Sequence, residues 1–75
     1  MSNEIKALQR AVAALGSAAA LSKALGVSSS MPHMWKLRGR IPAEHCPGIE
    51  RATRGLVKCE ELRPDIDWAV LRDVA

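Results

Sequence analysis

The chain has 75 residues, of which 48% are hydrophobic, and a formal net charge of +3. This length suits one domain with a thin core, and the hydrophobic fraction excludes disorder as the default state. The apolar residues are mostly Ala, Leu, Val and Ile, with no Phe or Tyr, which favours packed helices over a β-sandwich. We expect residues 1–75 to form a single all-α domain.

The sequence shows no sign of membrane insertion or secretion. It lacks an apolar run of about 18 residues, the length that a membrane-spanning helix needs. Its first residues lack the basic region, apolar run and cleavage site of a signal peptide. We therefore expect a cytoplasmic protein without a membrane partner, in which Cys46 and Cys59 are reduced.

The charges are unevenly distributed along the chain. Residues 5–43 contain six basic and no acidic residues, whereas residues 44–75 contain seven acidic and five basic residues. The first part therefore carries a formal charge of +6 and the second a charge of −2. Such a separation favours a surface that faces a polyanion. A basic surface that is simply solvated fits the charge pattern equally well.

Two helices are predicted at the start of the chain, over residues 3–15 and 18–25. In the first, apolar side chains recur at three- and four-residue steps, at Ile5, Leu8, Val12 and Leu15. Gly16 ends this helix, and Ser17 is a good N-cap for the next one. Gly26 ends the second helix after about two turns, so it needs a packing partner to be stable.

A third helix is predicted around Trp35, and two starting points are consistent with the sequence. If Ser28 is the N-cap, Pro32 is the fourth helical residue and removes about one backbone hydrogen bond. Alternatively, the helix begins near Met31, with Pro32 at the first position, where a missing N–H is tolerated. In both cases Gly39 ends the helix.

The second half of the chain is expected to contain one further helix and shorter turns. The fourth helix runs roughly over residues 43–53, where Pro47 and Gly48 weaken or bend its beginning and Gly55 ends it. The apolar anchors expected beyond it are Leu56, Val57 and Leu62, around a short turn at residues 60–61. A last helical turn, capped by Asp65 or Asp67, is expected through Trp68, Val70 and Leu71, and we expect Trp68 to pack against other apolar residues. The whole pattern is that of an all-α bundle of about five short helices.

The second and third predicted helices carry the sequence signature of a helix-turn-helix. The signature reads Leu21-Ser22-x-x-Leu25-Gly26-Val27-Ser28, with Trp35 seven residues further on. Gly26 accepts the left-handed conformation that turns the chain sharply. The small side chain of Ser22 lets the two helices touch, and Val27 fills the angle between them. We expect Trp35 to be a core residue.

In this motif the second helix enters the major groove, and its early outward residues meet base edges. The candidate base-reading residues are Ser29, Ser30, His33 and Met34. The candidate phosphate-binding residues, which fix register and supply affinity, are Ser17, Lys23, Lys36, Arg38 and Arg40. His33 is either a base reader, through a hydrogen bond to guanine, or an exposed bystander.

The two cysteines and two histidines offer a zinc site or a nucleophile as competing interpretations. His45 and Cys46 are adjacent and Cys59 lies thirteen residues further on, which matches no ordinary zinc spacing. Adjacent residues on a helix also point about 100° apart, and no third group is available to orient a nucleophile. We predict buried structural thiols, no metal, no cofactor and no catalytic residue.

The second half of the chain carries a family resemblance. The segment from Ile41 to Thr53, IPAEHCPGIERAT, and the segment from Cys59 to Trp68, CEELRPDIDW, are similar to segments of Cro-type phage repressors and YdaS-like antitoxins of the same superfamily. With the helix-turn-helix, the resemblance covers residues 17–71. It implies a compact Cro-like, lambda-repressor-like bundle of about five helices, encoded by a bacterium, a phage or a prophage.

The resemblance also implies a function and its residues. The base-reading positions of that superfamily fall on Ser29, Ser30, His33 and Met34 of this sequence. At Pro32 the chain departs from the pattern, because relatives commonly carry a valine or isoleucine that faces the core. The implied function is a transcriptional repressor that binds double-stranded operator DNA as a homodimer and excludes polymerase by occupancy.

Two alternatives remain at this point. One is an antitoxin, in which the same DNA-binding domain also binds a toxin protein. The other is a helical protein-interaction module that does not bind DNA and would show no salt-dependent affinity for duplexes. We favour sequence-specific DNA binding, because the helix-turn-helix signature, the basic residues around it and the charge separation all point to it.

Overall fold

The structure, a computed structural model, describes residues 3–72 and the side chains of residues 3–70. Over this range the chain forms helices joined by turns, which confirms the predicted all-α class. The elements are α1 (Asn3–Leu15), α2 (Ala18–Leu25), α3 (Met31–Arg38), a 3₁₀ turn (Ala43–His45), α4 (Cys46–Ala52), α5 (Cys59–Leu62) and α6 (Trp68–Arg72). None of these helices is long and apolar enough to cross a membrane.

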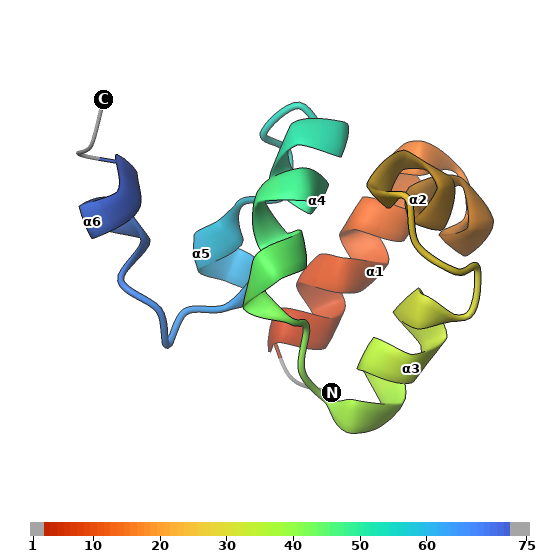
Figure 1. Ribbon diagram of the computed structural model, residues 1–75, viewed down its shortest axis with the longest axis horizontal. Helices are drawn as coiled ribbons and strands as arrows, with labels where there is room; N and C mark the ends of the chain where they lie inside the picture. The colour runs from red at the N-terminus through yellow and green to blue at the C-terminus, as the bar shows by residue number, and fades with distance from the viewer. Residues whose placement is uncertain (1–2, 73–75) are drawn as a thin grey trace.

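The helices are arranged around α1 and α4, which lie in the middle of the molecule (Figure 1). Helices α2 and α3 lie at one end of the long axis, and α5 and α6 lie toward the other end. Helix α1 contacts both α2 and α5, and α4 contacts the same two helices. The predicted helix-turn-helix therefore occupies one end of a bundle that measures 32 × 23 × 18 Å.

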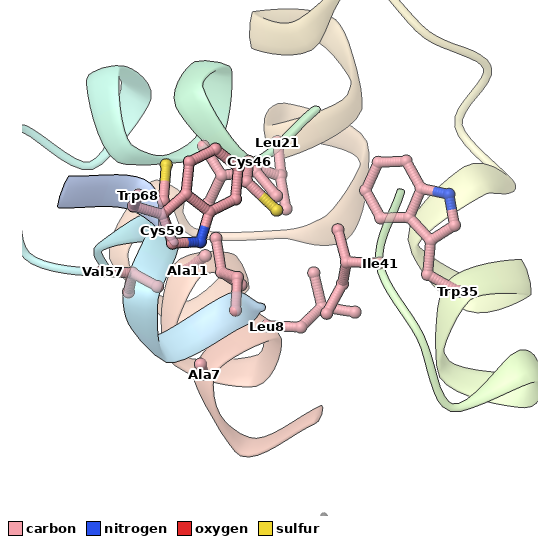
Figure 2. Packing of buried hydrophobic residues seen from close by; sticks show 12 residues of the cluster. Ala7, Leu8, Ala11, Leu21, Trp35, Ile41, Cys46, Val57, Cys59 and Trp68 are labelled. Atoms are coloured by element: carbon pink, nitrogen blue, oxygen red, sulfur yellow. The ribbon is translucent and has the colours of Figure 1, made fainter. Parts of the chain in front are cut away.

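A single cluster of buried side chains joins these elements. Trp35 of α3 and Trp68 of α6 lie on opposite sides of this cluster in Figure 2, with Leu8 and Ile41 between them. Its largest fully buried side chains are Trp35, Leu21, Ile41, Ile49, Leu62 and Val57. Of the predicted anchors, Val57 and Leu62 are buried, as is Trp68, but Leu56 is 58% exposed, so that prediction is wrong for Leu56.

The predicted fourth helix is divided into two parts. Residues 43–45 form the 3₁₀ turn, and α4 begins only at Cys46, so that Pro47 lies in its first turn. A proline is tolerated there because the first N–H groups of a helix have no intrahelical partner. Helix α4 is capped by Thr53, whose hydroxyl donates to the carbonyl oxygen of Ile49 at 2.9 Å.

Gly48 lies inside α4 for a packing reason. A Cβ atom added at this position would lie 2.9 Å from Cδ2 of Leu25, which is closer than carbon atoms approach without strain. The absence of a side chain at Gly48 therefore lets α4 approach the end of α2. This contact packs the C-terminal end of α2 against α4.

Arg63 connects the segment after α5 to the segment before the 3₁₀ turn. Its Nη1 donates to the carbonyl oxygen of Ile41 at 3.0 Å, and its Nε and Nη2 donate to the two carboxylate oxygens of Asp65 at 2.9 and 2.8 Å. The carbonyl oxygen of Arg63 accepts a hydrogen bond from Nε1 of Trp68 at 2.8 Å. One arginine thus holds both the loop before α4 and the beginning of α6.

The paired arginine changes the titration of the exposed Asp65. Its hydrogen bonds and charge lower the pKa of Asp65 from the usual 3.8 to about 2. Because the folded-state pKa lies below the unfolded one, the pair stabilises the fold above about pH 4, and this contribution disappears as the pH falls toward 2. We therefore expect Asp65→Asn to lower the melting temperature at pH 7 but not at pH 2.

Circular dichroism melts of both proteins at pH 7, 4, 3 and 2 measure this effect. Glu44→Gln is the matched control, because Glu44 is an exposed carboxylate outside the Arg63 pair. It should leave the melting temperature close to that of the wild type at each pH. If Asp65→Asn lowers the melting temperature by the same amount at pH 7 and pH 2, the charge of Asp65 is not the source of the stabilisation.

Candidate nucleic-acid interface

The turn after α2 has the geometry that the sequence predicts. Ser17 caps α2, its Oγ accepting a hydrogen bond from the backbone N–H of Ala20 at 3.0 Å. At the other end Gly26 has φ 72° and ψ 29°, in the left-handed region. The N–H of Val27 donates to the carbonyl oxygen of Ser22 at 3.0 Å, which closes the helix end in the way that a left-handed glycine permits.

The third helix uses the later of the two predicted starts. Helix α3 begins at Met31, and Pro32 lies in its first turn. Ser28 therefore does not cap the helix. It stabilises the preceding turn instead: its Oγ accepts a hydrogen bond from the N–H of Ser30 at 3.4 Å, and its carbonyl oxygen accepts from the N–H of Met31 at 3.0 Å. Ser29 and Ser30 consequently lie in a turn that leads into α3.

The inner face of α3 consists of Pro32 and Trp35, which are both buried. The ring of Trp35 has no exposed surface and lies 5.2 Å, between centroids, from the ring of His45. Pro32 therefore occupies the inward position at which the resemblance implies valine or isoleucine. Because residues three apart in a helix share a face, burial of these two side chains fixes which residues of α3 point outward.

The structure places all four candidate base-reading residues at the surface. Ser29 and Ser30 are exposed in the turn, and His33 and Met34 are exposed on α3. Sequence reasoning missed Leu37, whose side chain is 69% exposed. Its spacing, four residues after His33, is the signal that places it on the same outward face.

The candidate phosphate-binding residues are exposed as well. Lys36 and Arg38 lie in the last turn of α3, and Arg40 follows Gly39, which has φ 72°. Lys23 lies in the last turn of α2. The hydroxyl of Ser17 accepts the capping hydrogen bond, and its own proton stays available for donation to an anion.

One of the six basic residues in the first part of the chain has a structural role. Arg10 forms an ion pair with Glu61 and donates from Nη2 to the carbonyl oxygen of Leu56 at 3.0 Å. It thereby joins α1 to α5, on the opposite side of α1 from the helix-turn-helix. Of the other five, Lys6 lies on the same side of α1 as Arg10. Lys23, Lys36, Arg38 and Arg40 belong to the helix-turn-helix or follow it directly.

The cysteines are core residues, as predicted. Cys46 and Cys59 are both buried, and the Sγ of Cys46 lies 3.6 Å from the carbonyl oxygen of Pro42. Burial raises the pKa of the Cys46 thiol from 9.0 to about 12, so it is protonated at neutral pH and a poor nucleophile. Within residues 3–70 no three His, Cys, Asp or Glu side chains gather at a site that could hold a metal ion.

Comparisons with known proteins show which family the chain resembles. The family described as "Bacterial toxin YdaS" matches residues 8–71 of the chain. A protein of Escherichia coli (strain K12) with the name "Putative transcriptional regulator YdaS" is 50% identical over 74 residues, which cover 96% of this chain and 74% of that protein.

The fold also has a counterpart among solved structures. It is the "Structure of the Cro protein from putative prophage element Xfaso 1 in Xylella fastidiosa strain Ann-1", with a TM-score of 0.77 and 52% sequence identity. The match covers 80% of this chain and 92% of the other chain. The similarity therefore includes most of the bundle and confirms the resemblance found in the sequence.

Proposed function

Because this chain belongs to the YdaS family, we propose that it is a sequence-specific DNA-binding repressor that acts by occupying operator DNA. The observation that carries the proposal is the exposed face of α3. It presents the polar His33 and the apolar Met34 and Leu37, and the cations Lys36 and Arg38 lie in its last turn. The names of the two similar proteins, a transcriptional regulator and a Cro protein, support the same function. Such a repressor acts in the bacterial cytoplasm, as a single helix-turn-helix domain.

In the proposed mechanism α3 lies in the major groove. A helix with its side chains is about 10–12 Å in diameter, which is about the width of the groove. His33 and Met34 then face base edges, and Ser29 and Ser30 reach them from the preceding turn. Lys36, Arg38 and Arg40 lie at the far end of the helix, where they contact phosphates and fix its register.

We propose that the protein binds as a homodimer. Recognition helices of such dimers enter successive major grooves, which are about 34 Å apart on one side of the duplex. The longest dimension of one protomer is 32 Å, which is comparable with this spacing, so two copies fit side by side on one face of the duplex. Repression then follows because the bound dimer covers promoter DNA and excludes polymerase.

The family description as a toxin supports a second candidate function, in which the protein harms the cell that expresses it. DNA binding could cause this harm through the genes that are repressed. Loss of growth inhibition in a variant with a defective α3 surface would connect the two functions. An antitoxin role with a toxin partner stays a prediction from the sequence.

The proposed function is tested by fluorescence anisotropy at fixed salt concentration. The full chain is titrated against the duplex upstream of its own gene and against a scrambled duplex. We expect the native duplex to bind at least about a thousandfold more tightly. Equal weak affinity for both would contradict specific recognition of that site, and no binding at low salt would overturn DNA binding.

Arg38→Ala should weaken the binding of all duplexes alike, because a phosphate contact carries no sequence information. We expect the slope of log K against log salt concentration to fall by about one unit. Arg51→Ala is the matched control, since Arg51 is an exposed cation of α4 that lines a pocket beside Trp68. A similar change of slope in both variants would place the phosphate contacts outside α3.

Ser30→Ala and His33→Ala should act on the cognate site alone. Each removes a hydrogen-bonding side chain that faces a base edge, with an expected loss of about 1–3 kcal/mol. Anisotropy titrations of both variants on cognate and scrambled duplexes measure the difference. If they weaken both duplexes alike, as Arg38→Ala is expected to do, then α3 is wrongly oriented in the proposed complex.

A further inference from the structure

The outward face of α3 carries two exposed apolar side chains beside its polar ones. Leu37 is 69% exposed and Met34 is 36% exposed. The other large hydrophobic side chains that are exposed in the described part of the chain, Leu56 and Val70, lie outside the helix-turn-helix. An exposed leucine alone needs no explanation. Met34 and Leu37, however, are neighbours on the helix that the proposed function places in DNA, and such a pair requires an explanation.

Helical geometry places Leu37 in the centre of this face. It follows His33 by four residues and Met34 by three, so the three side chains are neighbours on the helix surface. The buried residues Pro32 and Trp35 occupy the opposite side. Because the rotation of α3 is determined by that burial, Leu37 points in the same direction as the candidate base readers.

The charges around Leu37 favour a nucleic-acid partner. Lys36 and Arg38 flank it in the sequence, Arg40 follows three residues later, and all three are exposed. An apolar protein surface would have to desolvate these cations, whereas a duplex offers them phosphates. The major groove also presents one apolar group to a recognition helix, the C5 methyl of thymine.

We propose that Leu37 is a specificity-determining residue that contacts a thymine methyl group in the major groove. The inference rests on the proposed function. Leu37 lies only ~6 Å from His33 along the helix axis. The thymine that it contacts is therefore close to the base that His33 meets, within the same half of the operator.

The test compares thymine with uracil, which lacks only the C5 methyl group. A preferred duplex is first selected from a random library with the full chain, and each thymine is then replaced singly by deoxyuridine. For the wild type we expect one replacement to raise the Kd about three- to tenfold, the effect of removing one buried methyl contact. Leu37→Ala should raise the Kd by a similar factor on the thymine duplex.

Leu37→Ala should then be insensitive to uracil at that same position, because the contact has already been lost. Leu37→Met retains an apolar side chain and should keep the sensitivity to uracil. Leu56→Ala, which truncates a leucine of comparable exposure outside α3, is the matched control and should bind like the wild type. Circular dichroism melts and sedimentation verify that each variant is folded and keeps its oligomeric state.

Three results would overturn the inference while leaving the proposed function intact. Leu37→Ala could bind the selected duplex as tightly as the wild type. It could bind more weakly but still lose as much affinity as the wild type when uracil replaces the critical thymine, which would show that Leu37 does not contact that methyl group. It could also change the oligomeric state, which would place Leu37 in a protein contact. Failure to select any preferred duplex would instead overturn the proposed function.

Discussion

Burial of Trp35 is the constraint on which the rest of the structure depends. The indole lies in the core without exposed surface, and its Nε1 has no hydrogen-bond partner among the described residues. An unpaired buried N–H costs about 1–3 kcal/mol. Removing roughly 150–250 Å² of ring surface from water stabilises the fold by roughly 4–6 kcal/mol, so burial outweighs the loss. Because Trp35 cannot turn outward, α3 has only one rotation in which His33, Met34 and Leu37 face solvent.

A short chain achieves this arrangement by close contact between helices. Gly48 lets α4 approach Leu25 at the end of α2, and Ala11 is completely buried in α1. Where side chains are this small, most of the volume of the core comes from a few large residues, among them Trp35 and Leu21. The bundle therefore presents α3 on a rigid support although α3 itself is only eight residues long.

The basic residues that the structure describes fall into two groups, those that form ion pairs within the fold and those that stay unpaired at the surface. Arg10 joins α1 to Glu61 of α5, and Arg63 joins Asp65 to the carbonyl oxygen of Ile41. Both arginines act between segments that are distant in sequence. Lys36 and Arg38, by contrast, are exposed on α3 and form no ion pair with a described residue. A net charge of +3 is thus a poor measure of the interface, because it includes cations with structural contacts.

The sequence by itself determined the local features of this protein. The ends of α2 and α3 follow from Gly26 and Gly39, because a left-handed turn strongly favours glycine, and the helix-turn-helix follows from the signature at residues 21–28 with Trp35. Only the tertiary structure decided that α3 starts at Met31, that residues 43–45 are separate from α4, and that Leu56 is no anchor. These features depend on contacts between residues far apart in the chain, and the periodicity of a short segment does not contain that information.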